Sequence, residues 1–161
     1  MTTQAVSIPA LLRSARGAYG NAIREELFDA SFEDMPRNGP FVLGGMANHG
    51  FAAGDLIREL GVSKQAASQL VDTLVLRGYL ERRVNADDRR RIDIELTERG
   101  RAAAQAIRAG VESVDDELSN RLAPGELAGL VSGLIALTTI REEGEERARL
   151  ERPAGGGRSG A

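Results

Sequence analysis

The sequence predicts a mostly α-helical fold that carries one small β-hairpin. Two observations predict it. Residues 62–77 show the apolar spacing of an amphipathic helix directly after a short segment that ends at Gly61, and residues 79–84 and 91–96 alternate between apolar and polar side chains. A helix, a tight turn, a second helix and a hairpin follow one another in a winged helix-turn-helix domain, here flanked by N- and C-terminal helices.

The first 31 residues predict a flexible start and one long helix. Residues 1–8 are polar, and residues 9–31 carry an apolar stripe at helical spacing. Pro9 suits a first helical turn, whereas Gly17 and Gly20 are expected to loosen the helix or break it.

The next predicted elements complete the first half of the helix-turn-helix. Residues 32–40 are rich in Asp, Asn, Gly and Pro and predict a loop. Residues 41–51 form a second helix in spite of two adjacent glycines, which cost about 1 kcal/mol each relative to alanine. Those glycines either admit another backbone or leave room for a small molecule. Residues 55–60 form a short third helix.

Residues 62–77 then predict a helix with one packing face and one exposed face. Ser63 is placed to cap its first turn. The packing face consists of Ala66, Ala67, Leu70, Val71 and Leu74. The opposite face consists of Lys64, Gln65, Ser68, Gln69 and Asp72. Gln pairs with adenine and Lys with guanine in the major groove of DNA, so this face could read base edges. Any solvated helix face carries such side chains as well, and this helix alone does not distinguish a DNA-reading face from an ordinary solvated one.

The hairpin tip is charged. Residues 85–90 are turn-forming and end in a basic run. The tip is interpreted either as a DNA-contacting wing or as a solvated cluster of ion pairs with little energetic consequence.

The hairpin and the residues after it resemble the MarR family of winged helix-turn-helix transcriptional regulators. The resemblance rests on an Asp-x-Arg motif followed, after five residues, by Leu-Thr-x-x-Gly. The motif residues are Asp88, Arg90, Leu96, Thr97 and Gly100. Motifs support the resemblance over residues 55–110, and helix pattern and length support it elsewhere.

The resemblance implies that Asp88 braces Arg90 and that Arg90 enters the minor groove, where narrow groove width concentrates negative potential. Many relatives carry Arg where this chain has Gln69, so contacts from that position are expected to differ. The predicted DNA-contacting residues are Ser63, Lys64, Gln65, Ser68, Gln69, Arg82, Asp88, Arg89 and Arg90.

Two further helices are predicted at the C-terminal end. Thr97 caps a helix that runs to about Arg121, and Pro124 begins a last helix with a long apolar stripe. The stripe either covers the core of the same domain or, as the resemblance implies, forms a homodimer through dimerisation helices 9–31 and 98–150. We expect one domain over residues 9–151, with the winged helix-turn-helix over residues 40–97, and a disordered tail over residues 152–161.

Charge is unevenly distributed in the 161 residues, whose net charge is −3. Residues 58–108 hold 11 Lys or Arg and 8 Asp or Glu, a net charge of +3, and the remaining residues hold 10 and 16, a net charge of −6. A basic unit with acidic flanks is typical of a protein in which one surface meets phosphates.

Composition excludes several other classes. The chain has no cysteine and a single histidine, His49, which rules out disulfides and thiol chemistry and disfavours a zinc site. No cofactor fingerprint and no catalytic constellation appears, so we expect neither an enzyme nor a cofactor or metal. Without a long apolar run or a signal peptide, we expect a soluble, cytoplasmic protein with no membrane contact.

These observations favour a homodimeric repressor that binds double-stranded DNA at a pseudo-palindromic operator. The resemblance implies that a small effector, often an aromatic acid or phenol, releases it. The predicted effector site consists of Arg16, Tyr19, Phe41, Met46, Asn48 and His49. The alternative is a winged-helix module that binds proteins and not DNA. Operator sequence, effector identity and the sign of regulation do not follow from the sequence.

Overall fold

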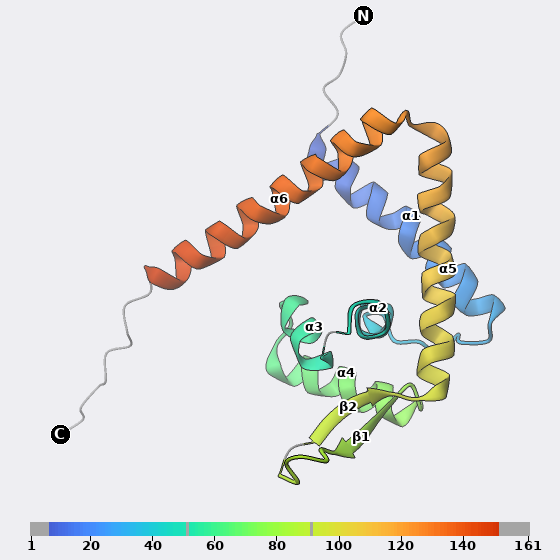
Figure 1. Cartoon of the computed structure of the whole chain (residues 1–161), viewed down its shortest axis with the longest axis vertical. Coiled ribbons are helices and arrows are strands. Elements are labelled where there is room, and N and C mark those ends of the chain that lie inside the picture. Colours follow the sequence, from blue (N-terminus) through green and yellow to red (C-terminus); the bar gives the residue numbers. More distant parts are fainter. Residues whose placement is uncertain (1–6, 51, 91, 152–161) are drawn as a thin grey trace, which may run out of the picture. The chain divides into compact units, whose positions relative to one another are not determined.

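The computed structural model describes residues 7–50, 52–90 and 92–151, which fold into helices and one hairpin (Figure 1). This confirms the mostly helical fold with an antiparallel two-stranded wing. In chain order the elements are α1 Ile8–Asp29, α2 Gly39–His49, α3 Ala53–Glu59, α4 Lys64–Leu76, β1 Leu80–Val84, β2 Ile92–Leu96, α5 Glu98–Arg121 and α6 Pro124–Leu150. Two compact units, Met1–Asp115 and Asp116–Ala161, are described separately.

Helix α1 is continuous, so the expected break at its glycines is wrong. Glycine lowers helix propensity but keeps its backbone N–H and carbonyl, so the hydrogen-bond ladder continues through Gly17 and Gly20. Nearer its C-terminal end, α1 packs closely on α5, since a Cβ on Gly110 of α5 would lie 2.7 Å from the Cα of Ile23 in α1. The two helices therefore approach backbone to backbone at this point.

Helices α2 and α3 each begin two residues before their predicted starts. In α2, Pro40 occupies the first turn, where its missing N–H costs nothing, and the helix ends before Gly50, whose φ is 65°. The predicted end at residue 51 lies outside the described residues. A Cβ on Gly45 would lie 2.5 Å from the Leu56 side chain, so this glycine lets α3 pack closely on α2.

The core of the first unit lies where α2, α3, α4, β1 and α5 meet. The hairpin pairs Leu80 with Leu96 at its base and Val84 with Ile92 at its far end. Burial falls along this register, from 1% exposure at Leu80 to 64% at Val84. The base of the wing therefore belongs to the core, whereas its far end projects into solvent. The largest fully buried side chains are Tyr79, Leu43, Leu74, Leu80 and Val42.

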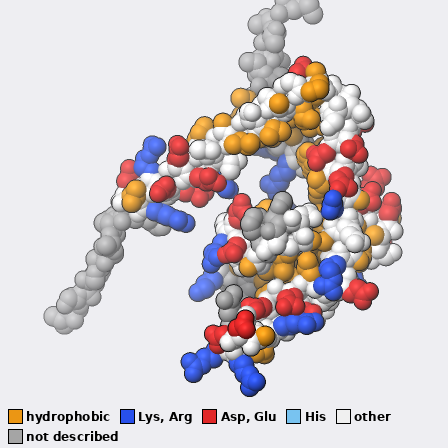
Figure 2. All heavy atoms as spheres, viewed as in Figure 1, with side chains coloured by type: hydrophobic (Ala, Val, Ile, Leu, Met, Phe, Trp, Pro, Cys, Tyr) orange, Lys and Arg blue, Asp and Glu red, His pale blue; other side chains and the backbone are white. Residues whose placement is uncertain are grey.

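The second unit contains the end of α5 and all of α6. Glu126 accepts a hydrogen bond from the backbone N–H of Ala123 at 2.9 Å and so caps the start of α6. No residue of α6 is buried. Figure 2 shows apolar side chains gathered along this helix. The exposed ones include Leu130, Val131, Leu134, Ile135, Leu137 and Ile140. Within the described residues, no helix combines the length and the apolar character needed to cross a membrane.

Candidate nucleic-acid interface

Helix α4 presents an ordered polar face to solvent. The hydroxyl of Ser63 accepts a hydrogen bond from the N–H of Ala66 at 3.2 Å, which is the cap that the sequence predicts. Gly61, with a φ of 64°, makes the turn from α3. Leu74 is buried while Ala66, which the periodicity assigns to the packing face, is exposed. The residues at this helix that the sequence predicts to contact DNA are all exposed: Ser63, Lys64, Gln65, Ser68 and Gln69.

The wing tip is built by side-chain hydrogen bonds to its own backbone. The amide oxygen of Asn85 accepts from the N–H groups of Asp87 at 2.8 Å and Asp88 at 2.9 Å, and its nitrogen donates to Asp93 at 2.6 Å. This closes an Asx-type turn before the basic run. Arg89 and Arg90 are exposed beyond it, and Figure 2 shows basic side chains at the free end of the hairpin.

Asp88 contacts Arg90 through the main chain. Its Oδ1 accepts from the backbone N–H of Arg90 at 3.0 Å. No ion pair joins the Asp88 carboxylate to the Arg90 guanidinium in the described part of the chain. Asp88 is only two residues from Arg90, so its short side chain reaches the amide first and shapes the turn from which the guanidinium projects.

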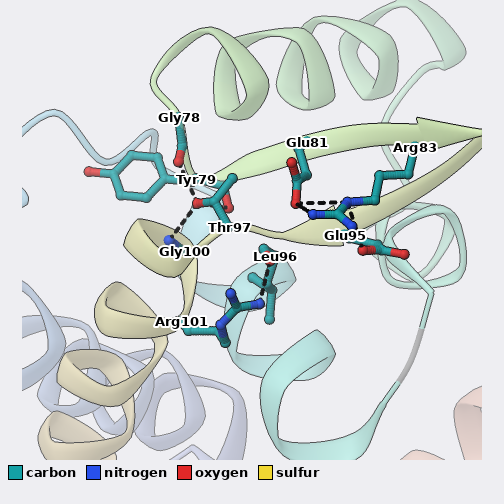
Figure 3. Close-up of polar contacts among 9 residues, drawn as sticks. All are labelled: Gly78, Tyr79, Glu81, Arg83, Glu95, Leu96, Thr97, Gly100 and Arg101. Atoms are coloured by element: carbon teal, nitrogen blue, oxygen red, sulfur yellow. Dashed lines mark hydrogen bonds and ion pairs between the residues drawn. The ribbon is translucent and has the colours of Figure 1, made fainter.

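The two arginines of β1 have different partners. Arg83 pairs with Glu81 of its own strand at 2.8 Å and with Glu95 of β2 at 3.3 Å (Figure 3). The hydrogen bond from Arg83 to Glu81, aided by the charge of both carboxylates, raises the pKa of Arg83. Arg82, which the sequence predicts to contact DNA, pairs with Asp72 of α4.

Thr97 and Gly100 join the wing to α5 (Figure 3). The Thr97 hydroxyl donates to the carbonyl of Gly78 at 2.5 Å and accepts from the N–H of Gly100 at 2.9 Å, and the Thr97 N–H donates to the carbonyl of Tyr79 at 3.1 Å. A Cβ on Gly100 would lie 2.0 Å from the Tyr79 carbonyl oxygen. The Leu-Thr-x-x-Gly motif is thus a cap and a close contact at the base of the hairpin.

A polar junction connects the loop before α2 to the wing and to α5. The carboxylate of Asp34 accepts from the hydroxyl of Tyr79 and from Arg99 at 2.9 Å, while Arg77 at the end of α4 donates to the Asp34 carbonyl. The Arg99 guanidinium lies 4.7 Å from the Tyr79 ring centroid and 5.6 Å from that of Phe32.

The contacts in this junction shift the pKa values of Asp34 and Tyr79. The hydrogen bond from Tyr79, followed by the charge of Arg99, holds the pKa of the Asp34 carboxyl below its usual range. Burial raises the pKa of Tyr79, and its contact with Asp34 acts in the same direction. Sequence reasoning missed this junction because Asp34 is 45 residues from Tyr79 and 65 from Arg99. The only local signal was a polar loop.

The predicted effector site is only partly described. The Tyr19 hydroxyl donates to Asp115 at 2.6 Å, and that bond, with burial, raises the pKa of Tyr19 to about 12. Met46 packs against the core, and the His49 side chain lies outside the described part of the chain. Arg16, Phe41 and Asn48 are exposed. Among the described residues, no hydrogen bond joins the α1 members of this set to the α2 members.

An exposed polar helix preceded by a tight turn and followed by a hairpin with a basic tip defines a winged helix-turn-helix protein. The MarR family model matches residues 34–91, which include α2, α3, α4 and most of the wing. This stretch of 58 of the 161 residues is therefore similar to the MarR family.

A curated protein is similar to one part of the chain. The transcriptional repressor MprA of Escherichia coli (strain K12) is 40% identical over 53 residues, which are 33% of this chain and 30% of MprA. The chain therefore matches about a third of the length of this curated relative.

Solved structures are similar over more of the chain. The S. aureus MepR–DNA complex matches with a TM-score of 0.65 and 20% identity over 83% of this chain and 97% of MepR. MarR from E. coli in its apo form matches with a TM-score of 0.59 and 21% identity over 83% and 98% of the two chains. BpsR from Bordetella bronchiseptica matches with a TM-score of 0.61 and 19% identity over 84% and 95%. At these identities the likeness concerns the fold.

Proposed function

We propose that the chain is a homodimeric repressor that binds double-stranded DNA at a pseudo-palindromic operator. The observation that carries the proposal is the pairing of an exposed polar face on α4 with exposed Arg89 and Arg90 at the tip of the adjacent wing. A helix of this kind reads base edges in the major groove, and arginine at a wing tip reads the width of the minor groove. MprA is named a transcriptional repressor and MepR is solved with DNA, which supports the same function here.

The test is fluorescence anisotropy with a duplex that the protein itself selects from a random pool, compared with a scrambled duplex over a salt series. We expect preferential binding of the selected duplex with a steep salt dependence. Arg90→Ala removes the wing arginine and should lower affinity at least tenfold, corresponding to about 1.4 kcal/mol. Arg108→Ala removes the same charge from an exposed ion pair of α5 and serves as the matched control.

Two results would count against DNA recognition. If selection enriches no sequence and both duplexes bind weakly and equally, the protein-binding alternative replaces the proposal. If Arg90→Ala and Arg108→Ala lower affinity to the same small extent, the wing tip acts only through net charge.

The homodimer is proposed from the apolar surface of α6. Ile135 is 61% exposed and Ile140 is 64% exposed on a helix in which no residue is buried. A contiguous apolar surface of this kind is unfavourable in water, and a second copy of the chain would cover it. Two copies related by a two-fold axis place their α4 helices in successive major grooves about 34 Å apart.

Sedimentation or light scattering tests the dimer. Wild-type protein should have twice the chain mass, and Leu134→Glu, which puts a charge on the apolar stripe, should shift it toward monomer. Glu143→Gln, an exposed substitution on the same helix, is the control. A monomeric wild type at all concentrations would refute the dimer.

The effector proposal extends a property named for a relative, since DNA binding by BpsR is regulated by 6-hydroxynicotinic acid. A ligand shifts DNA affinity only if it binds one spacing of the two α4 helices better than another. We expect an aromatic carboxylate to raise the melting temperature and weaken DNA binding, and a Tyr19→Phe variant to respond less. A broad panel that causes no shift at millimolar concentration would contradict it.

A further inference from the structure

Asp72 is an acidic residue on the face of α4 that the proposed function turns toward DNA. It lies seven residues after Gln65, about 20° from it around the helix at 100° per residue. Its side chain is 59% exposed. A carboxylate so placed opposes phosphate binding, and that cost calls for a compensating role.

Asp72 is paired with Arg82 of the wing. One guanidinium nitrogen of Arg82 lies 2.5 Å from Oδ1 of Asp72, across a sequence separation of ten residues. In the strand register Arg82 is opposite Ile94, between the Leu80–Leu96 and Val84–Ile92 pairs. Because side chains alternate along a strand, Arg82 shares the strand face of buried Leu80, the face that packs on the helices.

This ion pair is a polar link between the hairpin and α4. Arg83, by contrast, pairs with Glu81 and Glu95 and so holds the hairpin only to itself. Apolar packing does not extend further along the wing, since Val84 is 64% exposed and Ile92 is 60% exposed. The Asp72–Arg82 pair therefore lies where the hairpin leaves the apolar core.

We propose that the Asp72–Arg82 pair is a strut that fixes the wing relative to α4, so that Arg89 and Arg90 meet the minor groove while α4 occupies the major groove. Asp72 and Arg82 are thus positioning residues, and Arg82 acts through Asp72 in place of the DNA contact that the sequence predicts for it. The strut rests on the proposed function. The strut should affect the affinity for the selected duplex, because only in that complex must α4 and the wing tip bind their grooves at the same time.

The strut and simple electrostatics predict opposite signs for Asp72→Asn. Removal of a carboxylate from the DNA-facing surface should, by charge alone, strengthen binding to any duplex. Loss of the strut should weaken binding to the selected duplex while binding to the scrambled duplex stays level or rises. An exposed ion pair limits the effect, so we expect a loss of about two- to fivefold in specific affinity.

The experiment measures both affinities for wild type, Asp72→Asn, Arg82→Gln and the double variant. With a strut, Asp72→Asn lowers specific affinity and the double variant loses no more than the larger single loss, because the two residues act as one unit. Glu81→Gln removes the same charge from a pair that stays within the hairpin, and should raise both affinities together.

The proposal is overturned if Asp72→Asn raises specific affinity while Arg82→Gln lowers both affinities and reduces the salt slope by about 1, since Arg82 would then contact phosphate directly. Hydrogen exchange without DNA separates this proposal from the function on which it rests. If the wild type selects no DNA, the proposed function fails, but the strut can still be tested. It requires hairpin amides to exchange faster in Asp72→Asn than in wild type. Glu112→Gln, which removes the same charge from an exposed ion pair within α5, is the control and should leave hairpin exchange unchanged. Unchanged hairpin exchange in Asp72→Asn would refute the strut.

Discussion

Substitution of Gly100 by alanine tests the contact that joins the wing to α5. A Cβ at this position would lie 2.0 Å from the backbone carbonyl oxygen of Tyr79 and 3.0 Å from its carbonyl carbon. Because real Cβ atoms essentially never approach closer than 3.0 Å, α5 and the start of β1 must separate by about 1 Å. Neither neighbour is a side chain that could rotate away, and Tyr79 is fully buried.

The expected cost follows from two effects. Overpacking of a close contact costs about 1–3 kcal/mol, and displacement of the Thr97 hydrogen bonds at the same place adds about 1 kcal/mol. We therefore expect Gly100→Ala to reduce the free energy of unfolding by about 2–4 kcal/mol. For a chain of this size that corresponds to a fall in melting temperature of roughly 5–15 °C.

Two other helical glycines serve as an internal scale. Gly54 has nothing within 4 Å of its Cβ position, so Gly54→Ala should leave stability unchanged or raise it by up to about 1 kcal/mol. Gly45→Ala meets the Leu56 side chain, which can adjust, and should fall between the two. Thermal denaturation of the three variants measures the order, and a Gly100→Ala melting temperature within about 2 °C of wild type would refute the close contact.

The remaining predictions concern caps and titrating groups. Ser63→Ala removes the cap of α4 and should cost about 1 kcal/mol in chemical denaturation, whereas Ser63→Asp should retain most of it. Because the fold lowers the pKa of Asp34, its contribution to stability is present above the unfolded value of about 3.9 and is lost as pH falls through the folded pKa. Acid denaturation should therefore be shallower in Asp34→Asn, and an unchanged curve would contradict the junction with Arg99. Tyr19 shows the opposite sign: with a pKa raised to about 12, it stabilises the fold below the unfolded value of about 10, and that contribution is lost as pH rises through the folded pKa. Ultraviolet titration of the wild type and Tyr19→Phe should place this ionisation near 12, and a value near 10 would mean that the bond to Asp115 does not form in solution.

The sequence by itself determined the elements and placed their boundaries to within about two residues. The 3.6-residue period of α4, the cap at Ser63 and the alternation of the strands are local signals, because each arises from contacts within a few residues. The charged tip was equally evident. The break expected in α1 was wrong because propensity is a weak term, and packing such as that of Gly110 on α1 outweighs it.

The tertiary structure alone decided the partners of the charged side chains. Sequence reasoning did not predict the pairing of Arg82 with Asp72. It also gave no role to Asp34, which accepts hydrogen bonds from Tyr79 and Arg99. The sequence showed Gly100 as part of a motif. The structure shows why a glycine is needed there, because the Tyr79 carbonyl, 21 residues earlier in the chain, leaves no room for a Cβ. A periodic pattern shows which face a side chain occupies. Its partner depends on which distant segment packs on that face, and that is decided only when the whole core forms.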